Sequence, residues 1–178
     1  MLNRIFYRLK QFFRALISKP TEDDKAFVRR YLNIEEAALF DNLSQYEKKH
    51  AIIVAQKMVD VARGSEELNE KEIAKFGLLH DIGKVAVKFS LFDKVVLVVL
   101  RRIFPPLYNG LAKKGEGRPS FILKKFYVHK FHGKIGAELL GRIGVSDKIR
   151  ELVETHDKKP EPDDPLELML LRQLDDRS

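Results

Sequence analysis

The sequence predicts an all-α fold of about seven to nine helices. Apolar residues recur at helical rather than strand spacing, and glycine and proline are sparse, with 10 and 7 among 178 residues. Helix-start signals are also frequent, because a polar residue repeatedly precedes a glutamate by three positions and can form a capping box with it. These predicted capping boxes are Asn33 with Glu36, Ser44 with Glu47, and Asn69 with Glu72.

The first predicted helix, residues 2–17, is amphipathic and basic. Residues 1–20 contain five basic residues and no acid. The apolar stripe could pack onto the rest of the domain or onto a second copy, or it could lie in a membrane interface. We favour packing and keep peripheral membrane contact through residues 2–17 as the alternative. The predicted organisation is an N-terminal basic amphipathic helix at 1–19 and one multi-helix domain at 20–178.

The composition excludes several classes of protein. Hydrophobic residues make up 44% and charged residues 33% of the chain, which is ordinary for a globular domain. The chain has no cysteine, which rules out a disulfide scaffold, a zinc finger and a cysteine nucleophile. The longest unbroken apolar run, Val95–Leu100, is far too short to span a bilayer, and arginines interrupt any signal-peptide core. We expect a cytoplasmic protein, with peripheral attachment to the inner membrane face as the alternative.

Basic residues are concentrated in one internal segment. The net charge is +7, but residues 84–130 alone contain eleven basic residues against Asp93 and Glu116. Such a concentration favours an anionic partner. Within it, residues 85–128 are predicted to be a helical insert that forms a substrate lid, a membrane-facing surface or simply extra helices. Nucleic acid is disfavoured because no recognition-helix or aromatic-and-basic sheet pattern is present.

Four histidines and one late aspartate occupy inward positions of different predicted helices. A buried, isolated aspartate costs much free energy unless a cation compensates it, so a shared metal site is the simplest explanation. Histidine–carboxylate mixtures suit iron or manganese. Neighbours on a helix diverge by about 100°, so the adjacent pair His80-Asp81 could straddle one metal or contact two. The inward residues are His50, His80, His132, His156 and Asp175.

Four further residues have open roles at this stage. His129 is either a support for the site or a surface group, and Asp157 is either a nearby base or a solvated side chain. Asp175 and Asp176 are alternative candidates for the late aspartate. We favour Asp175 because it shares a helical face with Leu168 and Leu171. Lys84 is either an exposed basic residue or a cation placed for phosphate.

The segment Gly77-Leu-Leu-His-Asp-Ile-Gly-Lys84 resembles the HDIGK signature of the HD-domain metal-dependent phosphohydrolases. Residues 50–55, 132–140 and 152–156 are similar to three further ligand helices of that family. Residues 170–175 are similar to its last helix, although Leu174 replaces the usual alanine. The resemblance covers residues 44–176.

The resemblance implies a compact helical HD-domain bundle with six metal ligands. His50, His80, Asp81 and Asp175 would form the basic set, and His132 with His156 would add a second metal. Asp81 would bridge the metals, and Lys84 would hold a phosphate oxygen, so both are the expected catalytic residues. The expected cofactor is a divalent, binuclear centre, with iron or manganese favoured and magnesium, nickel or cobalt as alternatives.

The implied reaction is hydrolysis of a phosphoester or phosphoanhydride in a nucleotide-like substrate through attack by a metal-bound hydroxide. The Gly-Tyr-Pro element of the cyclic di-GMP phosphodiesterase branch is missing, and the pattern is closer to hydrolases of symmetrical dinucleoside polyphosphates. One alternative is a non-catalytic HD module that binds a nucleotide or docks on a membrane or partner. Another is an oxygenase on the same scaffold. A homodimer is left open.

Overall fold

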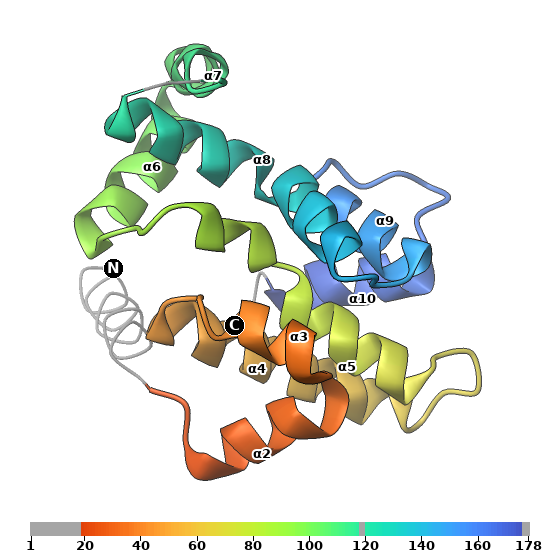
Figure 1. The fold of residues 1–178 in the computed structure, drawn as a ribbon. Coiled ribbons are helices and arrows are strands. Elements are labelled where there is room, and N and C mark those ends of the chain that lie inside the picture. Colours follow the sequence, from red (N-terminus) through yellow and green to blue (C-terminus); the bar gives the residue numbers. More distant parts are fainter. Residues whose placement is uncertain (1–18, 118–119, 176–178) are drawn as a thin grey trace, which may run out of the picture. The chain divides into compact units, whose positions relative to one another are not determined.

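The computed structural model describes residues 19–117 and 120–175 (Figure 1). In these residues every regular element is helical, with nine α-helices, one 3-10 helix and no strand, which confirms the predicted all-α class. The predicted helix at residues 2–17 lies outside the described part. The described chain divides into two compact units, residues 19–79 with 158–175 and residues 80–157. No described helix is long and apolar enough to cross a membrane.

The first unit is organised around its longest helix. That helix, α4, packs against three others of the same unit, α2, α5 and α10. Large buried side chains such as Phe40, Ile52 and Phe76 form its core. The elements of the unit are α2 (Glu22–Tyr31), α3 (Ile34–Phe40), α4 (Gln45–Ala62), α5 (Glu70–Leu79) and α10 (Leu166–Asp175).

The helix starts of this unit follow local sequence signals. The predicted capping boxes at Asn33 and Ser44 are both present, each with reciprocal bonds to a glutamate three residues later. Asn69 Oδ1 accepts the backbone N–H of Glu72 at 3.0 Å, as expected for the start of α5. A further box, not predicted, joins Thr21 to Asp24 at the start of α2.

The second unit contains four α-helices and the 3-10 helix. Helices α6, α7 and α8 pack together around Leu97, Tyr108, Ala112 and Phe126, so the insert segment has a small hydrophobic core of its own. The other part of the unit consists of η1, α8 and α9, which also pack together. The elements are η1 (Ile82–Ala86), α6 (Leu91–Ile103), α7 (Pro105–Lys114), α8 (Phe121–Arg142) and α9 (Asp147–Thr155).

Helix α8 belongs to both parts of the second unit. It is interrupted at Phe131, whose φ of −118° and ψ of 20° are not helical. The residues before the kink pack with the insert helices, and the residues after it pack with η1 and α9. The kink falls immediately before His132, so the backbone changes direction at a predicted metal ligand.

Asp24 makes a buried ion pair in the first unit. Its Oδ2 accepts from Lys49 Nζ at 2.5 Å and from the backbone N–H of Thr21 at 2.7 Å. Burial raises the pKa of Asp24, but the bonds from Lys49 and Thr21 outweigh burial, so the pKa is lowered from 3.8. A carboxyl with a lowered folded-state pKa stabilises the fold above its unfolded pKa, and this contribution is lost as the pH falls through the folded value.

We therefore expect Asp24→Asn to reduce the free energy of unfolding by about 1–3 kcal/mol at neutral pH. The difference from the wild type should begin to shrink below about pH 4, where the carboxyl of the unfolded chain is protonated, and should disappear as the pH falls through the lowered pKa of the folded state. Urea denaturation followed by circular dichroism over a pH series measures both effects. The matched control is Asp23→Asn, an exposed carboxyl in the same helical turn. An equal loss in both variants would contradict the role of the ion pair.

Candidate metal centre

The His-Asp dipeptide lies in a turn between two helices. Helix α5 ends at Leu79 and η1 begins at Ile82, so His80 and Asp81 are not helical neighbours as the sequence had suggested. The turn arises because the backbone of Asp81, with φ −96° and ψ 9°, leaves the α-helical path. Both side chains are buried, with 0% and 4% exposure.

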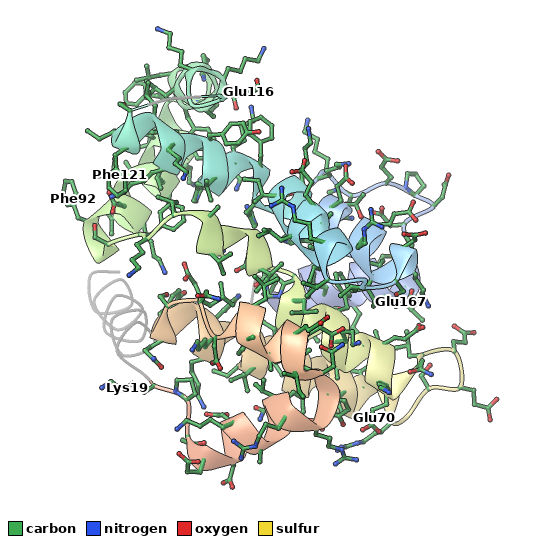
Figure 2. All side chains as sticks on the ribbon, in the orientation of Figure 1. Lys19, Glu70, Phe92, Glu116, Phe121 and Glu167 are labelled. Atoms are coloured by element: carbon green, nitrogen blue, oxygen red, sulfur yellow. The ribbon has the colours of Figure 1, made fainter. Side chains whose placement is uncertain are left out.

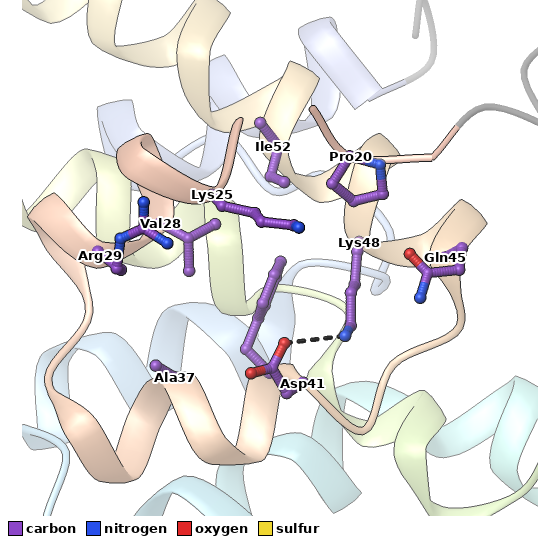
Figure 3. A pocket seen from close by; sticks show the side chains of 10 residues that line it. Pro20, Lys25, Val28, Arg29, Ala37, Asp41, Gln45, Lys48 and Ile52 are labelled. Atoms are coloured by element: carbon purple, nitrogen blue, oxygen red, sulfur yellow. Dashed lines mark hydrogen bonds and ion pairs between the residues drawn. The ribbon is translucent and has the colours of Figure 1, made fainter. Parts of the chain in front are cut away.

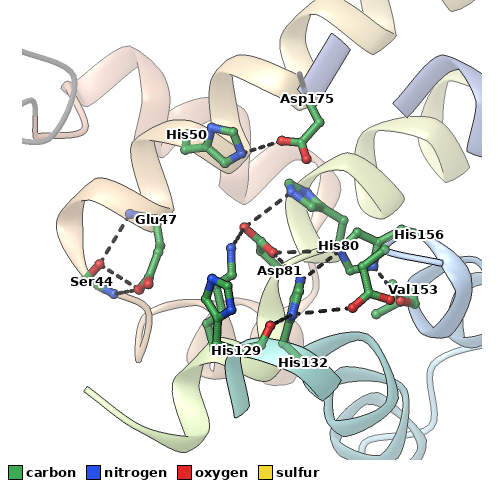
Figure 4. A network of polar contacts seen from close by, with 12 residues as sticks. Ser44, Glu47, His50, His80, Asp81, His129, His132, Val153, His156 and Asp175 are labelled. Atoms are coloured by element: carbon green, nitrogen blue, oxygen red, sulfur yellow. Dashed lines mark hydrogen bonds and ion pairs between the residues drawn. The ribbon is translucent and has the colours of Figure 1, made fainter. Parts of the chain in front are cut away.

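Asp81 meets two of the predicted histidine ligands inside the second unit. Its Oδ1 lies 3.2 Å from His132 Nε2 and 3.8 Å from His156 Nε2, and the two Nε2 atoms are 3.2 Å apart (Figure 4). These potential ligand atoms all lie within 4.8 Å of one another. All three residues are buried. They come from three elements, because Asp81 lies in the turn, His132 on α8 and His156 at the C-cap of α9.

The hydrogen bonds of the two imidazoles indicate which nitrogens carry lone pairs. His132 Nδ1 is 3.0 Å from the carbonyl oxygen of His129, and His156 Nδ1 is 2.7 Å from that of Val153. A carbonyl accepts only, so each Nδ1 must carry the hydrogen, and in a neutral imidazole Nε2 is then an acceptor. Two acceptors and the Asp81 carboxylate cannot bond to one another. They require a shared cation, either a proton or a metal ion, which fits a divalent metal site.

The electrostatics of this cluster agree with a shared positive charge. Burial raises the pKa of Asp81, but Lys84 and the surrounding imidazoles together hold it well below 3.8. Burial lowers the pKa of His132 despite the Asp81 contact. Burial also opposes protonation of His156, yet the nearby Asp81 carboxylate raises its pKa overall. The carboxylate is therefore ionised, and the pocket favours one cation over two.

Lys84 contacts the other oxygen of the same carboxylate. Its Nζ donates to Asp81 Oδ2 at 2.5 Å, and its side chain is only 24% exposed. Lys84 is thus not a freely exposed basic residue, which was one of the two interpretations. Asp81 divides its oxygens, with Oδ1 toward the two imidazoles and Oδ2 toward the ammonium.

His80 lies next to this cluster within the second unit. Its Nε2 is 3.5 Å from Asp81 Oδ2, and its ring meets that of His156 edge to face at 5.4 Å. Asp157 lies on the opposite side of His132, with Oδ2 at 3.6 Å from Nδ1. This separation is too long for a hydrogen bond, but it places a carboxylate beside the protonated nitrogen.

The remaining predicted ligands form a pair in the first unit. His50, on α4, and Asp175, at the end of α10, approach to 2.7 Å between Nε2 and Oδ1. The two helices pack against each other, which explains how residues so distant in sequence meet. Asp176, the rival carboxylate, lies outside the described residues. That His50 and Asp175 share a metal with His80 and Asp81 remains a prediction.

Tyr108 is a residue of this region that the sequence did not single out. Its hydroxyl lies 2.6 Å from His129 Nδ1. Burial raises the pKa of Tyr108 to about 12, and burial with nearby Lys84 lowers that of His129 to about 3. The phenol is therefore protonated and donates to a neutral imidazole. The carbonyl of His129 accepts from His132 Nδ1, so His129 supports the centre. Tyr108 in turn connects the insert to His129. Because Tyr108 and His129 are 21 residues apart, no local sequence pattern could have predicted their contact.

Two glycines allow the elements of the centre to approach closely. A Cβ on Gly83 would overlap the carbonyl oxygen of His132 and lie 2.8 Å from the backbone nitrogen of Gly136. A Cβ on Gly133 would lie 2.9 Å from the carbonyl oxygens of Val153 and Glu154. The first close approach sets η1 against α8, and the second sets α8 against α9.

A separate pocket of about 310 Å³ lies in the first unit, among α2, α3 and α4 (Figure 3). It contains no histidine, and Lys25 and Lys48 on its wall are paired with Glu22 and Asp41. It therefore has no ligand set of the kind found around Asp81. It is lined by Pro20, Lys25, Val28, Arg29, Ala37, Phe40, Asp41, Gln45, Lys48 and Ile52.

We expect Gly83→Ala to displace η1 from α8 and to destabilise the protein by about 1–3 kcal/mol, because the new methyl group meets backbone rather than a flexible side chain. The metal content after purification should fall as well. Thermal denaturation and elemental analysis measure the two effects. Gly110→Ala, in helix α7 with no atom near the added Cβ, is the control and should be neutral or slightly stabilising. Equal behaviour of the two variants would count against this packing.

Comparison with known families agrees with the geometry. A family model described as HD domain matches residues 48–178, a range that contains all six predicted ligands. Comparisons with curated proteins and with solved structures gave no significant match. HD domains bind divalent metals, and the family generally contains metal-dependent phosphohydrolases. Since the match covers well over half of the sequence, the chain belongs to the HD domain family.

Proposed function

We propose that this protein is a metal-dependent phosphohydrolase that cleaves a phosphoester or phosphoanhydride bond in a nucleotide-like substrate. One observation carries the proposal. Asp81 Oδ1 and the Nε2 atoms of His132 and His156 are buried together as acceptors, and their mutual repulsion is relieved only by a cation. Membership of the HD domain family supports the same type of chemistry.

In the proposed site Asp81, His132 and His156 hold one divalent metal. When bound, such an ion lowers the pKa of coordinated water and neutralises charge on an attacked phosphoryl group. The carbonyls of His129 and Val153 keep each Nδ1 protonated and so direct each Nε2 toward the ion. Asp157, beside His132 Nδ1, stabilises the same tautomer.

We propose Lys84 as the residue that binds a phosphoryl oxygen. It is held by Asp81 Oδ2 at the edge of the cluster, and it keeps partial exposure, so a substrate anion can exchange for that contact. A fixed ammonium there would stabilise the charge that develops during the reaction. The basic residues of segment 84–130 would raise the local concentration of an anionic substrate.

We further propose a binuclear centre, with His50, His80 and Asp175 as additional ligands and with iron or manganese as the favoured metals. The His50–Asp175 pair in the first unit already joins an imidazole to a carboxylate. Mixed imidazole and carboxylate ligands suit these metals. The Asp81 carboxylate could bind one ion at each of its oxygens if Lys84 moved away from Oδ2.

The test begins with anaerobic purification, elemental analysis and a hydrolysis screen of nucleotides, dinucleoside polyphosphates and bis-p-nitrophenyl phosphate. The wild type should contain a first-row divalent metal and hydrolyse at least one substrate. Asp81→Asn and His156→Ala should lose both metal and activity. Lys84→Met should keep the metal but lower kcat by about 10²–10³-fold, because it removes only charge stabilisation. Lys71→Met, an exposed lysine on α5, should change neither.

A wild-type protein that neither retains nor takes up metal would refute the metal centre. Metal retention without turnover of any substrate would instead favour the alternative, a non-catalytic HD module that binds a nucleotide. Oxygen-dependent products, absent under anaerobic conditions, would favour the oxygenase.

A further inference from the structure

Large apolar side chains are exposed mainly in the insert part of the second unit. Nine of the thirteen exposed large hydrophobic residues in the described chain lie between positions 92 and 122. Single exposed apolar residues are normal on protein surfaces, whereas a cluster of them indicates an interaction surface. We call this cluster the insert patch. It consists of Phe92, Val95, Val98, Val99, Ile103, Phe104, Leu107, Phe121 and Ile122.

Helix α6 is apolar on two faces, and only one of them is covered. Leu97 is buried in the small core of the insert. On the other side, residues 92, 95, 99 and 103 follow one another at steps of three and four, which places them on one stripe. Phe92 is 75% exposed and Ile103 is 61% exposed. The outward stripe therefore has no counterpart among the described residues of the unit.

The first turn of α8 extends this stripe. Lys125 Nζ binds Asp93 at 2.5 Å and lies 4.6 Å from the centre of the Phe121 ring, so the starts of α6 and α8 are held together. Phe92 and Phe121 accordingly lie near each other, and both project outward (Figure 2). The parts of the insert patch on α6 and on the start of α8 are thus next to each other.

The charges around the insert patch select its occupant. Exposed Lys88, Arg102 and Lys124 accompany the apolar residues, whereas Arg101 follows the buried Leu97 by four positions and lies on the covered side of α6. Of the two acids in segment 84–130, Asp93 is already paired with Lys125. A second copy would present the same positive charge, and residues 1–20, with five basic residues and no acid, would be repelled as well. An anionic lipid surface complements both properties, because long basic side chains can reach phosphate groups while apolar residues enter the interface.

We propose that the insert patch docks on the surface of an anionic bilayer. Helix α6 is only 13 residues long, so it lies in the membrane plane rather than across it. Its outward stripe enters the headgroup region together with Phe121 and Ile122. Arg102 and Lys124, which follow the exposed Val99 and Phe121 by three positions, bind lipid phosphates. The proposal does not depend on the phosphohydrolase activity.

Flotation of the full-length protein with vesicles tests this directly. The protein should float with vesicles of equal parts phosphatidylcholine and phosphatidylglycerol, but not with phosphatidylcholine alone, and high salt should weaken binding. The double variant Phe92→Gln/Phe121→Gln should reduce the bound fraction about tenfold or more. Arg102→Gln/Lys124→Gln should also reduce binding to the anionic vesicles. Ile34→Gln, which changes an 89% exposed residue of the first unit, is the matched control and should not reduce it.

Circular dichroism should be unchanged in all these variants, which separates loss of docking from loss of fold. Hydrolysis of a soluble substrate should also be unchanged in Phe92→Gln/Phe121→Gln and in Ile34→Gln, because none of these residues belongs to the proposed site. Absence of flotation, equal binding to neutral vesicles, or an equal effect of Ile34→Gln would overturn the proposal. A further variant, Phe12→Gln/Phe13→Gln, distinguishes the predicted N-terminal helix. If it alone abolishes flotation while the insert variants bind normally, the proposal is wrong.

Discussion

Two imidazole nitrogens and a carboxylate oxygen, each with a lone pair toward the others, occupy one buried space in the second unit. Asp81 Oδ1 and the Nε2 atoms of His132 and His156 lie within 3.2–3.8 Å of one another. Such an arrangement is unfavourable unless a positive charge lies among them. The neighbouring contacts hold these three acceptors in place. The carbonyls of His129 and Val153 fix the orientation of the two imidazoles, and Lys84 fixes the Asp81 carboxylate through Oδ2.

The backbone does much of the positioning. The carbonyls of His129 and Val153, each three residues earlier in the chain, orient the imidazoles of His132 and His156 and so leave each Nε2 facing Asp81. Gly83 and Gly133 permit contacts at which a side chain would collide with a carbonyl. The glycine of the His-Asp-Ile-Gly-Lys segment is therefore explained by packing against α8, and the lysine by its contact with Asp81.

The insert and the centre are parts of one structural unit. Helix α8 contributes Phe126 to the small core of the insert and, after the kink at Phe131, His132 to the centre. The Tyr108–His129 hydrogen bond joins the two parts a second time. The exposed apolar face is thus connected to the proposed ligand His132 both through the backbone of α8 and through the Tyr108–His129 hydrogen bond.

Local patterns in the sequence determined the helices and the kinds of residue at the site. Capping boxes at Asn33 and Ser44 and the inward spacing of His132 and His156 depend on residues three or four positions apart, which a helix brings together by itself. The same reasoning failed for the His80-Asp81 pair, because a turn interrupts the helix there. Tertiary structure alone decided that Lys84 binds Asp81 Oδ2, that Tyr108 meets His129, and that His132 and His156, 24 residues apart, point their Nε2 atoms at each other. These contacts depend on how helices pack, and packing is set by many side chains together rather than by any local pattern.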